Sequence, residues 1–187
     1  MDEKKKERFN IRLQDDLSAM MLCNMAWIGV ELDLFKILAS KPTWTIQELA
    51  TASKCNERYI KEWLCAMSCS EWIEYNKEQQ TFTFPIEHQD LFIEREGNAA
   101  YRAGVFESIR LFSSGAPSIL NCFKNGGGLK QNEIHPNIYK AVENLTKSAQ
   151  LYWVPDFIEK KFPDLHEKLS AGITVSDVGC GVGKCNG

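Results

Sequence analysis

The sequence predicts a mainly α-helical protein with one small β-hairpin. It is expected to hold an N-terminal winged helix-turn-helix, a helical region and only the first strand of a Rossmann-like α/β domain. Helical apolar periodicity with clear cap signals comes first, and two short β-prone runs joined by a polar turn follow at residues 72–84. A β-branched run then enters a glycine-rich loop at residues 173–183. The expected domains are a winged-helix domain (11–90), a helical linker or lid region (91–172) and the first strand with its glycine loop (173–187).

Composition excludes several classes of protein. The 187 residues are 44% hydrophobic and carry 22 basic against 25 acidic side chains, so a net charge of −3 gives no general attraction to nucleic acid or anionic membrane. No apolar run approaches the roughly 20 residues of a membrane span, and the charged N-terminus does not resemble a signal peptide. Seven cysteines without paired C-x-x-C sets argue against zinc or a disulfide framework, and a cytoplasmic location is predicted.

The N-terminal segment predicts one amphipathic helix. Residues 1–10 form a charge run that is expected to be a solvated, frayed start. One apolar stripe then follows at helical spacing: Leu13, Leu17, Met20, Met21 and Met25. The stripe is expected to be core, and the alternative is a helix–helix face that makes a homodimer through this region. Gly29 is expected to interrupt the helix, and a second short helix follows over residues 34–38.

Strong local signals then predict the winged helix. Thr45 and Glu48 fit a capping box, which starts a third helix. Asn56 caps a fourth helix, whose expected inner face is Ile60, Trp63, Leu64 and Met67. Strand-like runs at residues 72–75 and 81–84 follow. The order helix, helix, hairpin is that of a winged helix-turn-helix.

The expected recognition helix is a poor match for DNA. Its outward residues include two of each sign, and the wing is net acidic: Glu57, Arg58, Lys61 and Glu62 on the helix, with Glu71, Glu74, Lys77 and Glu78 near the wing. Phosphate contacts dominate affinity for DNA and need a basic stripe. We therefore expect no specific nucleic-acid partner.

The chain after the wing is expected to be mostly helical. Helical spacing covers residues 99–112, another helix follows Pro136, and a third opens at Pro155 and is broken at Pro163. Residues 113–137 are expected to be irregular.

The glycine loop carries the main functional signal. The run 173–178 reads as a buried parallel strand, and it leads into a tight loop where glycine reaches positive φ and lets a ligand approach backbone N–H groups. The dinucleotide fingerprint fails because position 184 is lysine, and the phosphate loop fails because Cys185 follows that lysine. An ordinary strand-to-helix turn in another α/β protein is the alternative.

The pattern D-x-G-x-G-x-G at residues 177–183 resembles the first motif of class I S-adenosylmethionine (SAM)-dependent methyltransferases. The resemblance implies SAM as the cofactor, with the loop backbone against its amino-carboxypropyl end and Asp177 holding that polar end. The implied cofactor-binding residues are Asp177, Gly179, Cys180, Gly181 and Gly183. No catalytic residue and no metal ligand is assigned.

Scattered motifs extend the resemblance over about residues 12–183. They are G-V-E-L-D-L-F at 29–35, T-I-Q-E-L-A at 45–50, N-E-R-Y-I-K-E-W-L at 56–64, F-P-I-E-H at 84–88 and Y-W-V-P-D-F-I at 152–158. In this order they are similar to methyltransferases of the mycobacterial type that carry an N-terminal winged-helix domain and are sometimes labelled transcriptional regulators. The resemblance implies that the helical region forms part of a lid over SAM and substrate.

The sequence departs from this family after the glycine loop. The later strands, the acidic residue for the SAM ribose, the adenine pocket and the acceptor site are not found before Gly187. The expected function is therefore the N-terminal portion of a SAM-dependent methyltransferase, truncated after its first motif and inactive alone. The alternatives are a winged-helix interaction or dimerisation module and a weak DNA-binding transcriptional regulator.

Overall fold

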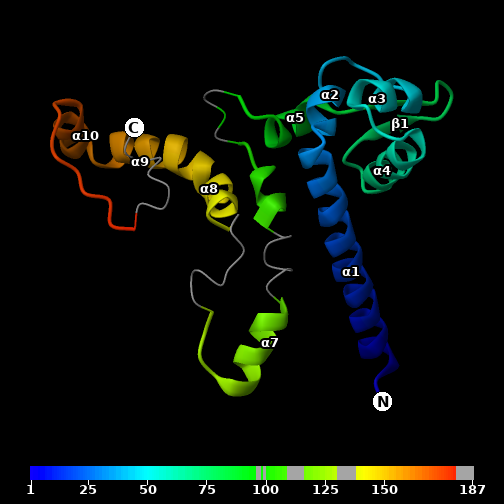
Figure 1. Cartoon of the computed structure of the whole chain (residues 1–187), viewed down its shortest axis with the longest axis horizontal. Coiled ribbons are helices and arrows are strands. Elements are labelled where there is room, and N and C mark those ends of the chain that lie inside the picture. The colour runs from blue at the N-terminus through cyan, green and yellow to red at the C-terminus, as the bar shows by residue number, and fades with distance from the viewer. Residues whose placement is uncertain (96–97, 99, 109–115, 130–137, 180–187) are drawn as a thin grey trace. The chain divides into compact units, whose positions relative to one another are not determined.

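A computed structural model of the chain describes residues 1–95, 98, 100–108, 116–129 and 138–179 (Figure 1). The chain divides into two compact units, Met1–Ile93 and Glu94–Gly187, and each is described by itself.

The N-terminal unit is a winged helix-turn-helix, as predicted. Its elements are α1 (Glu3–Glu31), α2 (Leu34–Leu38), α3 (Ile46–Ser53), α4 (Glu57–Cys69), β1 (Glu74–Asn76), β2 (Thr81–Thr83) and α5 (Ile86–Phe92). The antiparallel hairpin places Tyr75 opposite Phe82. Trp44 adds an isolated bridge, since its backbone exchanges two 2.8 Å hydrogen bonds with that of Phe82.

Both predicted helix caps of this unit are confirmed. The Glu48 backbone N–H donates to the Thr45 hydroxyl at 3.3 Å, and the Thr45 backbone N–H donates to the Glu48 carboxylate at 2.8 Å. The Asn56 side chain accepts a 3.1 Å hydrogen bond from the Arg58 backbone N–H. These bonds satisfy N–H groups that the first helical turn leaves without partners.

The unit is built around one apolar core, in which Trp63 is only 2% exposed. The buried members of this core are Leu34, Phe35, Leu38, Trp44, Leu49, Ala50, Ile60, Trp63, Leu64, Met67, Ile73, Phe82 and Phe84. The Trp63 ring packs edge-on against Phe35 with ring centroids 5.2 Å apart, and its Nε1 donates to the Met25 carbonyl at 2.8 Å. Burial of this ring and pairing of its polar atom both stabilise the fold.

Gly29 lies inside α1, so the prediction that it interrupts the helix is wrong. A Cβ at this position would lie 2.5 Å from Cζ2 of Trp63 and 2.7 Å from Cε2 of Phe35. Glycine is present because α1 crosses these two rings at close range, and tertiary packing outweighs the low helix propensity of glycine.

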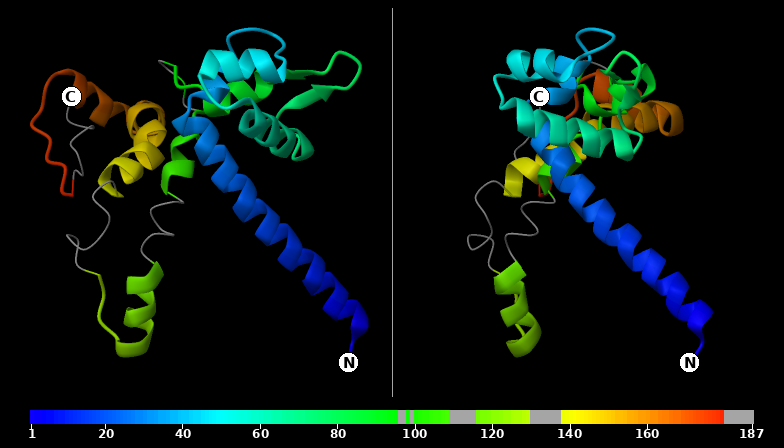
Figure 2. Two further views of the ribbon diagram at one scale, coloured as in Figure 1. Left: turned by 45° about the vertical axis from the view of Figure 1, so that its right-hand side comes forward. Right: turned by 90° about the vertical axis from the view of Figure 1, so that its right-hand side faces the viewer.

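The start of α1 also differs from the prediction of a frayed segment. The Asp2 side chain accepts a 3.0 Å hydrogen bond from the Lys5 backbone N–H, and the helix begins at Glu3. Every residue from 1 to 21 is exposed. The expectation of a core stripe is therefore wrong for Leu13, Leu17, Met20 and Met21, whereas Met25 packs against the core. Figure 2 shows α1 extending away from the winged helix as a straight rod.

The second unit is helical in its described parts. Residues 104–108 are helical, and the remaining helices are α7 (Ala116–Asn125), α8 (Ile138–Ser148), the π-helical turn η2 (Ala149–Trp153), α9 (Val154–Lys161) and α10 (Pro163–Ser170). The break before Pro163 is confirmed. The prediction of irregular chain is wrong over residues 116–125, where α7 forms. Pro136 lies outside the described residues. No described helix combines the length and apolarity that a membrane span requires.

The strand predicted over residues 173–178 does not form. Residues 173–177 have no regular secondary structure, residues 178–179 lie in a turn, and Val178 is 95% exposed. A parallel strand takes its hydrogen bonds from neighbouring strands. Among the described residues the only sheet is the hairpin of β1 and β2, so this apolar run finds no ladder partner there.

Candidate functional site

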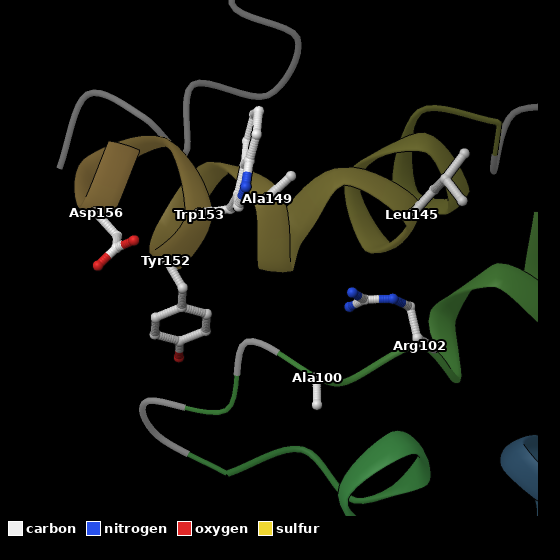
Figure 3. A pocket seen from close by; sticks show the side chains of 7 residues that line it. All are labelled: Ala100, Arg102, Leu145, Ala149, Tyr152, Trp153 and Asp156. Carbon is white, nitrogen blue, oxygen red and sulfur yellow. The ribbon is translucent and has the colours of Figure 1, made fainter. Parts of the chain in front are cut away.

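A pocket of about 920 Å³ lies within the second unit (Figure 3). Its lining residues are Ala100, Arg102, Leu145, Ala149, Tyr152, Trp153 and Asp156. One wall is the continuous run of α8, η2 and α9, which supplies five of the seven residues at helical spacing. The other wall is the segment 100–102. The volume lies in the range of small-molecule sites.

The side chains of the pocket combine aromatic, apolar and charged groups. In Figure 3 the Tyr152 ring and the Asp156 carboxylate leave the helix on the same side, toward the segment that carries Arg102. The Arg102 guanidinium extends into the space below the helix. The Trp153 ring leaves the helix in the opposite direction and stacks on Phe157 with centroids 5.6 Å apart.

The charged groups of the pocket have identifiable partners. Asp156 accepts a 2.7 Å contact from the Lys160 ammonium one turn later, and this hydrogen bond and the attraction of the carboxylate raise the Lys160 pKa above its ordinary value. Arg102 donates from Nη1 to the Tyr101 carbonyl at 2.8 Å.

Contacts along α8 hold the two walls of the pocket together. A Cβ at Gly104 would lie 2.8 Å from both Cβ and O of Asn144, so the segment 104–108 approaches α8 closely. The Asn144 amide donates to the Glu107 carboxylate, and Lys147 forms an ion pair with Glu94. These contacts connect residues 94–108 to the helix that carries the opposite wall.

The π-helical turn marks this wall as unusual. η2 covers Ala149–Trp153 and supplies three of the lining residues. π-turns are rare, occur mostly as single turns inside α-helices and are frequently found at functional sites. The coincidence of a π-turn and a pocket makes this the strongest candidate site among the described residues.

The predicted cofactor loop is described only in part. Asp177 is exposed, and Gly179 has a φ of 83°, in the left-handed region that favours glycine. Cys180, Gly181 and Gly183 lie outside the described residues. The cofactor assignment of these five residues therefore stays a prediction.

Sequence reasoning did not find the pocket. Leu145 and Ala149 have the spacing of an ordinary apolar helix face, and the helix dipole alone accounts for an acidic residue such as Asp156 just after Pro155. The spacing of residues 145–156 predicts one helical face but not whether that face meets core or a cavity. The second wall comes from a segment some 40 residues earlier, so no local pattern could have revealed it.

A second hollow, of about 550 Å³, lies at the start of α4. It is lined by Ile46, Asn56, Glu57, Arg58 and Lys61. Its lining includes the acidic Glu57 beside the basic Arg58 and Lys61, as the sequence predicts. Because the charges are mixed, this surface is poorly suited to contact DNA phosphates.

Comparisons with known proteins identify the winged helix. Residues 19–94 match the Rv2258c-like winged HTH domain, so the N-terminal part of the chain carries a domain of this kind. No curated protein matches the chain.

Two solved structures share the fold. One is PigF with SAH, at 14% identity and a TM-score of 0.58, covering 81% of this chain and 49% of that chain. The other is N,N-8-amino-8-demethyl-D-riboflavin dimethyltransferase (RosA) from Streptomyces davawensis, at 13% identity and a TM-score of 0.50, covering 87% of this chain and 49% of that chain. At such identities the likeness shows the fold alone. The chain spans about half the length of both structures.

Proposed function

We propose that residues 1–187 are the N-terminal portion of a SAM-dependent methyltransferase, and that the pocket under α8, η2 and α9 contributes to binding the methyl acceptor. The observation that carries the proposal is the fold shared over 81% of the chain with PigF, whose structure holds SAH. SAH is what SAM becomes after it gives up its methyl group. The dimethyltransferase RosA and the D-x-G-x-G-x-G pattern at 177–183 support the same reaction class.

Methyl transfer depends mainly on how the acceptor is oriented toward the methyl group of SAM. The acceptor lone pair forms a bond to the methyl carbon while the carbon–sulfur bond of the sulfonium breaks, and a base removes the acceptor proton. Holding the acceptor in line accounts for a large part of such a rate enhancement. Tyr152 offers a flat surface and Arg102 a charged anchor for an aromatic acceptor that carries an anionic or phenolic group.

A direct test of the pocket uses the aromatic anion 1-anilinonaphthalene-8-sulfonate as a probe, followed by its fluorescence. Arg102→Gln should weaken its binding about 10-fold, because a charge-assisted hydrogen bond is lost. Arg58→Gln, at the start of α4, is the matched control and should leave binding unchanged. Equal effects of the two substitutions would show that the dye binds elsewhere.

We further propose that residues 1–187 alone bind SAM too weakly to transfer methyl groups. The predicted loop residues can form one wall of a cofactor pocket, and ordering such a loop costs about 1–2 kcal/mol per residue. Hydrogen bonds return about 1 kcal/mol each. Isothermal titration of the chain with SAM should give a millimolar dissociation constant or no saturation. A micromolar constant that Gly181→Val abolishes would contradict this.

A DNA-binding regulator is the alternative, since the winged HTH domain is a fold that also serves DNA recognition. We propose only weak, non-specific duplex binding, no tighter than about 10⁻⁴ to 10⁻⁶ M at physiological salt. Fluorescence anisotropy with duplex DNA measures it. Submicromolar, sequence-selective binding would favour the regulator instead.

The proposed location is the cytoplasm. The described cysteines Cys23, Cys55, Cys65, Cys69 and Cys122 are free thiols, which supports a reducing compartment. Fractionation of cells that express the tagged chain tests this.

A further inference from the structure

Two cysteines, Cys65 and Cys69, lie on the outer face of α4, and both are exposed free thiols. At about 100° per residue, they lie about 40° apart round the helix axis and about 170° from the centre of its buried face. That buried face consists of Ile60, Trp63, Leu64 and Met67. Free cysteine is among the residue types most often buried, where it packs as a small apolar side chain. Neither of these two belongs to the core, so both sulfur atoms are accessible from solvent.

The spacing of the two thiols suits a bridging ion better than a disulfide. Residues four apart on a helix have Cβ atoms about 5–6 Å apart, whereas a disulfide needs Cβ atoms about 3.5–4.5 Å apart. A soft metal ion between the two sulfur atoms removes this mismatch, because each metal–thiolate bond adds about 2.3 Å. Cys65 and Cys69 can therefore hold an ion together while α4 keeps its helical geometry, whereas a direct disulfide would distort the helix.

The last turn of α4, which carries Cys69, is fixed by backbone hydrogen bonds. The Ser70 N–H donates to the Ala66 carbonyl at 3.3 Å, and the Trp72 N–H donates to the Met67 carbonyl at 3.0 Å. Met67 itself is fully buried in the core. The backbone that carries the two thiols is therefore in place before an ion binds, and a preorganised site loses less conformational entropy on binding than a mobile one.

The number of ligands selects the class of ion. Thiolates are soft ligands that favour Cu(I) and Zn²⁺ over hard cations such as Mg²⁺. Protein zinc sites use three or four protein ligands. Among the residues that the structure describes, no group of three or more His, Cys, Asp or Glu side chains is arranged to hold a metal ion. Two thiolates alone complete the coordination of Cu(I), which accepts a two-coordinate geometry.

We propose that Cys65 and Cys69 form a dithiolate site that binds one Cu(I) ion on the outer face of α4. Two S–H bonds break, two sulfur–copper bonds form, and two protons pass to solvent. Copper stays in the +1 state throughout, so the step needs no oxidant or reductant. Because the site lies on an exposed helix face, the ion can exchange directly with a carrier in solution.

The first experiment titrates the full chain with Cu(I) in anaerobic buffer, against the chromophoric competitor bathocuproine disulfonate. Alkylation with N-ethylmaleimide, followed by peptide mass spectrometry, measures the protection of each thiol. One equivalent of Cu(I) should protect Cys65 and Cys69 together, before any of the five other cysteines of the chain. Cys65→Ser should raise the dissociation constant of this site at least about 100-fold, because the second thiolate then no longer binds intramolecularly.

The second experiment tests the spacing with two variants that contain the same number of cysteines and lose the same charge. Glu62→Cys with Cys69→Ser keeps two thiols on adjacent turns, at positions 62 and 65, and should bind Cu(I) within about 10-fold of the unaltered chain. Glu62→Cys with Cys65→Ser places the thiols at positions 62 and 69, about 10 Å apart along the axis, and should bind at least about 100-fold more weakly. Circular dichroism checks that both variants keep the fold.

Two results would overturn the proposal. One is that Cu(I) protects other cysteines first and leaves Cys65 and Cys69 open to alkylation. The other is that the two spacing variants bind Cu(I) equally well, since a site made by adjacent turns must distinguish them. Both readouts are independent of SAM binding and of methyl transfer.

Discussion

Trp63 and Trp153 show how differently the two units use the same side chain. Trp63 is 2% exposed, packs against Phe35 and donates to the Met25 carbonyl. Trp153 is 62% exposed, stacks on Phe157 and lines a pocket. In the first unit a tryptophan holds three elements together. In the second it lies at the surface of the helix, and its ring points away from the segment that carries Arg102 (Figure 3).

The same contrast holds for whole helices. The α4 helix buries four apolar side chains, whereas α9 and α10 bury none. All three are amphipathic in sequence. Amphipathic patterning therefore predicts that a helix forms, but burial depends on whether a second apolar face lies opposite. This difference suits a stable first unit and a second unit that we propose to bind the methyl acceptor.

The largest expected effect tests the tryptophan comparison. Trp63→Ala should lower the free energy of unfolding by about 3–5 kcal/mol, because a fully buried ring leaves a cavity. Trp153→Ala is the matched control and should cost less than about 1 kcal/mol, because its ring is mostly in solvent. Urea denaturation followed by circular dichroism measures both. An equal loss in the free energy of unfolding for the two variants would contradict the difference in burial between the two tryptophans.

Glycines provide the next comparison. Gly29→Ala should destabilise the chain by about 1–3 kcal/mol, because the new methyl group overlaps the rings of Trp63 and Phe35. Gly128→Ala in the second unit meets no atom within 4 Å, so its effect should stay within about 0.5 kcal/mol. Thermal melts of the two variants compare them. If Gly29→Ala left the melting temperature unchanged, α1 would have to move away from the two rings without any loss of stability.

A smaller effect should appear as a pH dependence of the first unit. Hydrogen bonds from Lys41 and then from Thr45 lower the pKa of Glu48 from 4.5 to about 2. The ionised carboxylate therefore stabilises the fold fully above pH 4.5, and this contribution is lost as the pH falls toward 2. Glu48→Gln should lower the melting temperature at pH 7, and the difference from the unaltered chain should vanish near pH 2. Glu87→Gln in the first turn of α5 serves as the control, and a pH-independent difference would argue against this mechanism.

The smallest effect is expected at the end of the second unit. Deleting residues 173–187 should change the free energy of unfolding by less than about 0.5 kcal/mol, because the described part of this segment is exposed and unpaired. The same urea titration tests it. A loss comparable to that of Trp63→Ala would show that the segment packs on an apolar surface.

Local signals in the sequence were enough to predict the winged helix. The caps at Thr45 and Asn56 and the polar turn before Thr81 each specify their element within a few residues. The prediction of a strand at residues 173–178 was wrong because a strand depends on neighbouring strands that lie far away in the chain. The prediction that Gly29 interrupts the helix was wrong because the role of this glycine depends on the ring of Trp63, which no local pattern contains.

The pocket lay beyond sequence reasoning for a related reason. Helical spacing from Leu145 to Asp156 predicts one face, but the segment 100–102 that completes the cavity is distant in the chain. The π-turn that separates α8 from α9 has no simple sequence signature either. Thus local elements could be predicted, whereas the surfaces that they form together could not.

Because α1 contacts the core near Gly29 and Trp63, a small tilt of the helix at this point becomes a large displacement at its N-terminal end. Phe9 lies 20 residues from Gly29, which is about 30 Å along the helix axis. A tilt of about 10° at Gly29 would swing Phe9 by about 5 Å, roughly the spacing between neighbouring side chains on a helix. The close contact between Gly29 and the indole ring of Trp63 therefore determines the direction of the α1 axis and the position of its N-terminal end. The methyl group added by Gly29→Ala can therefore displace the N-terminal end of α1, which it does not contact.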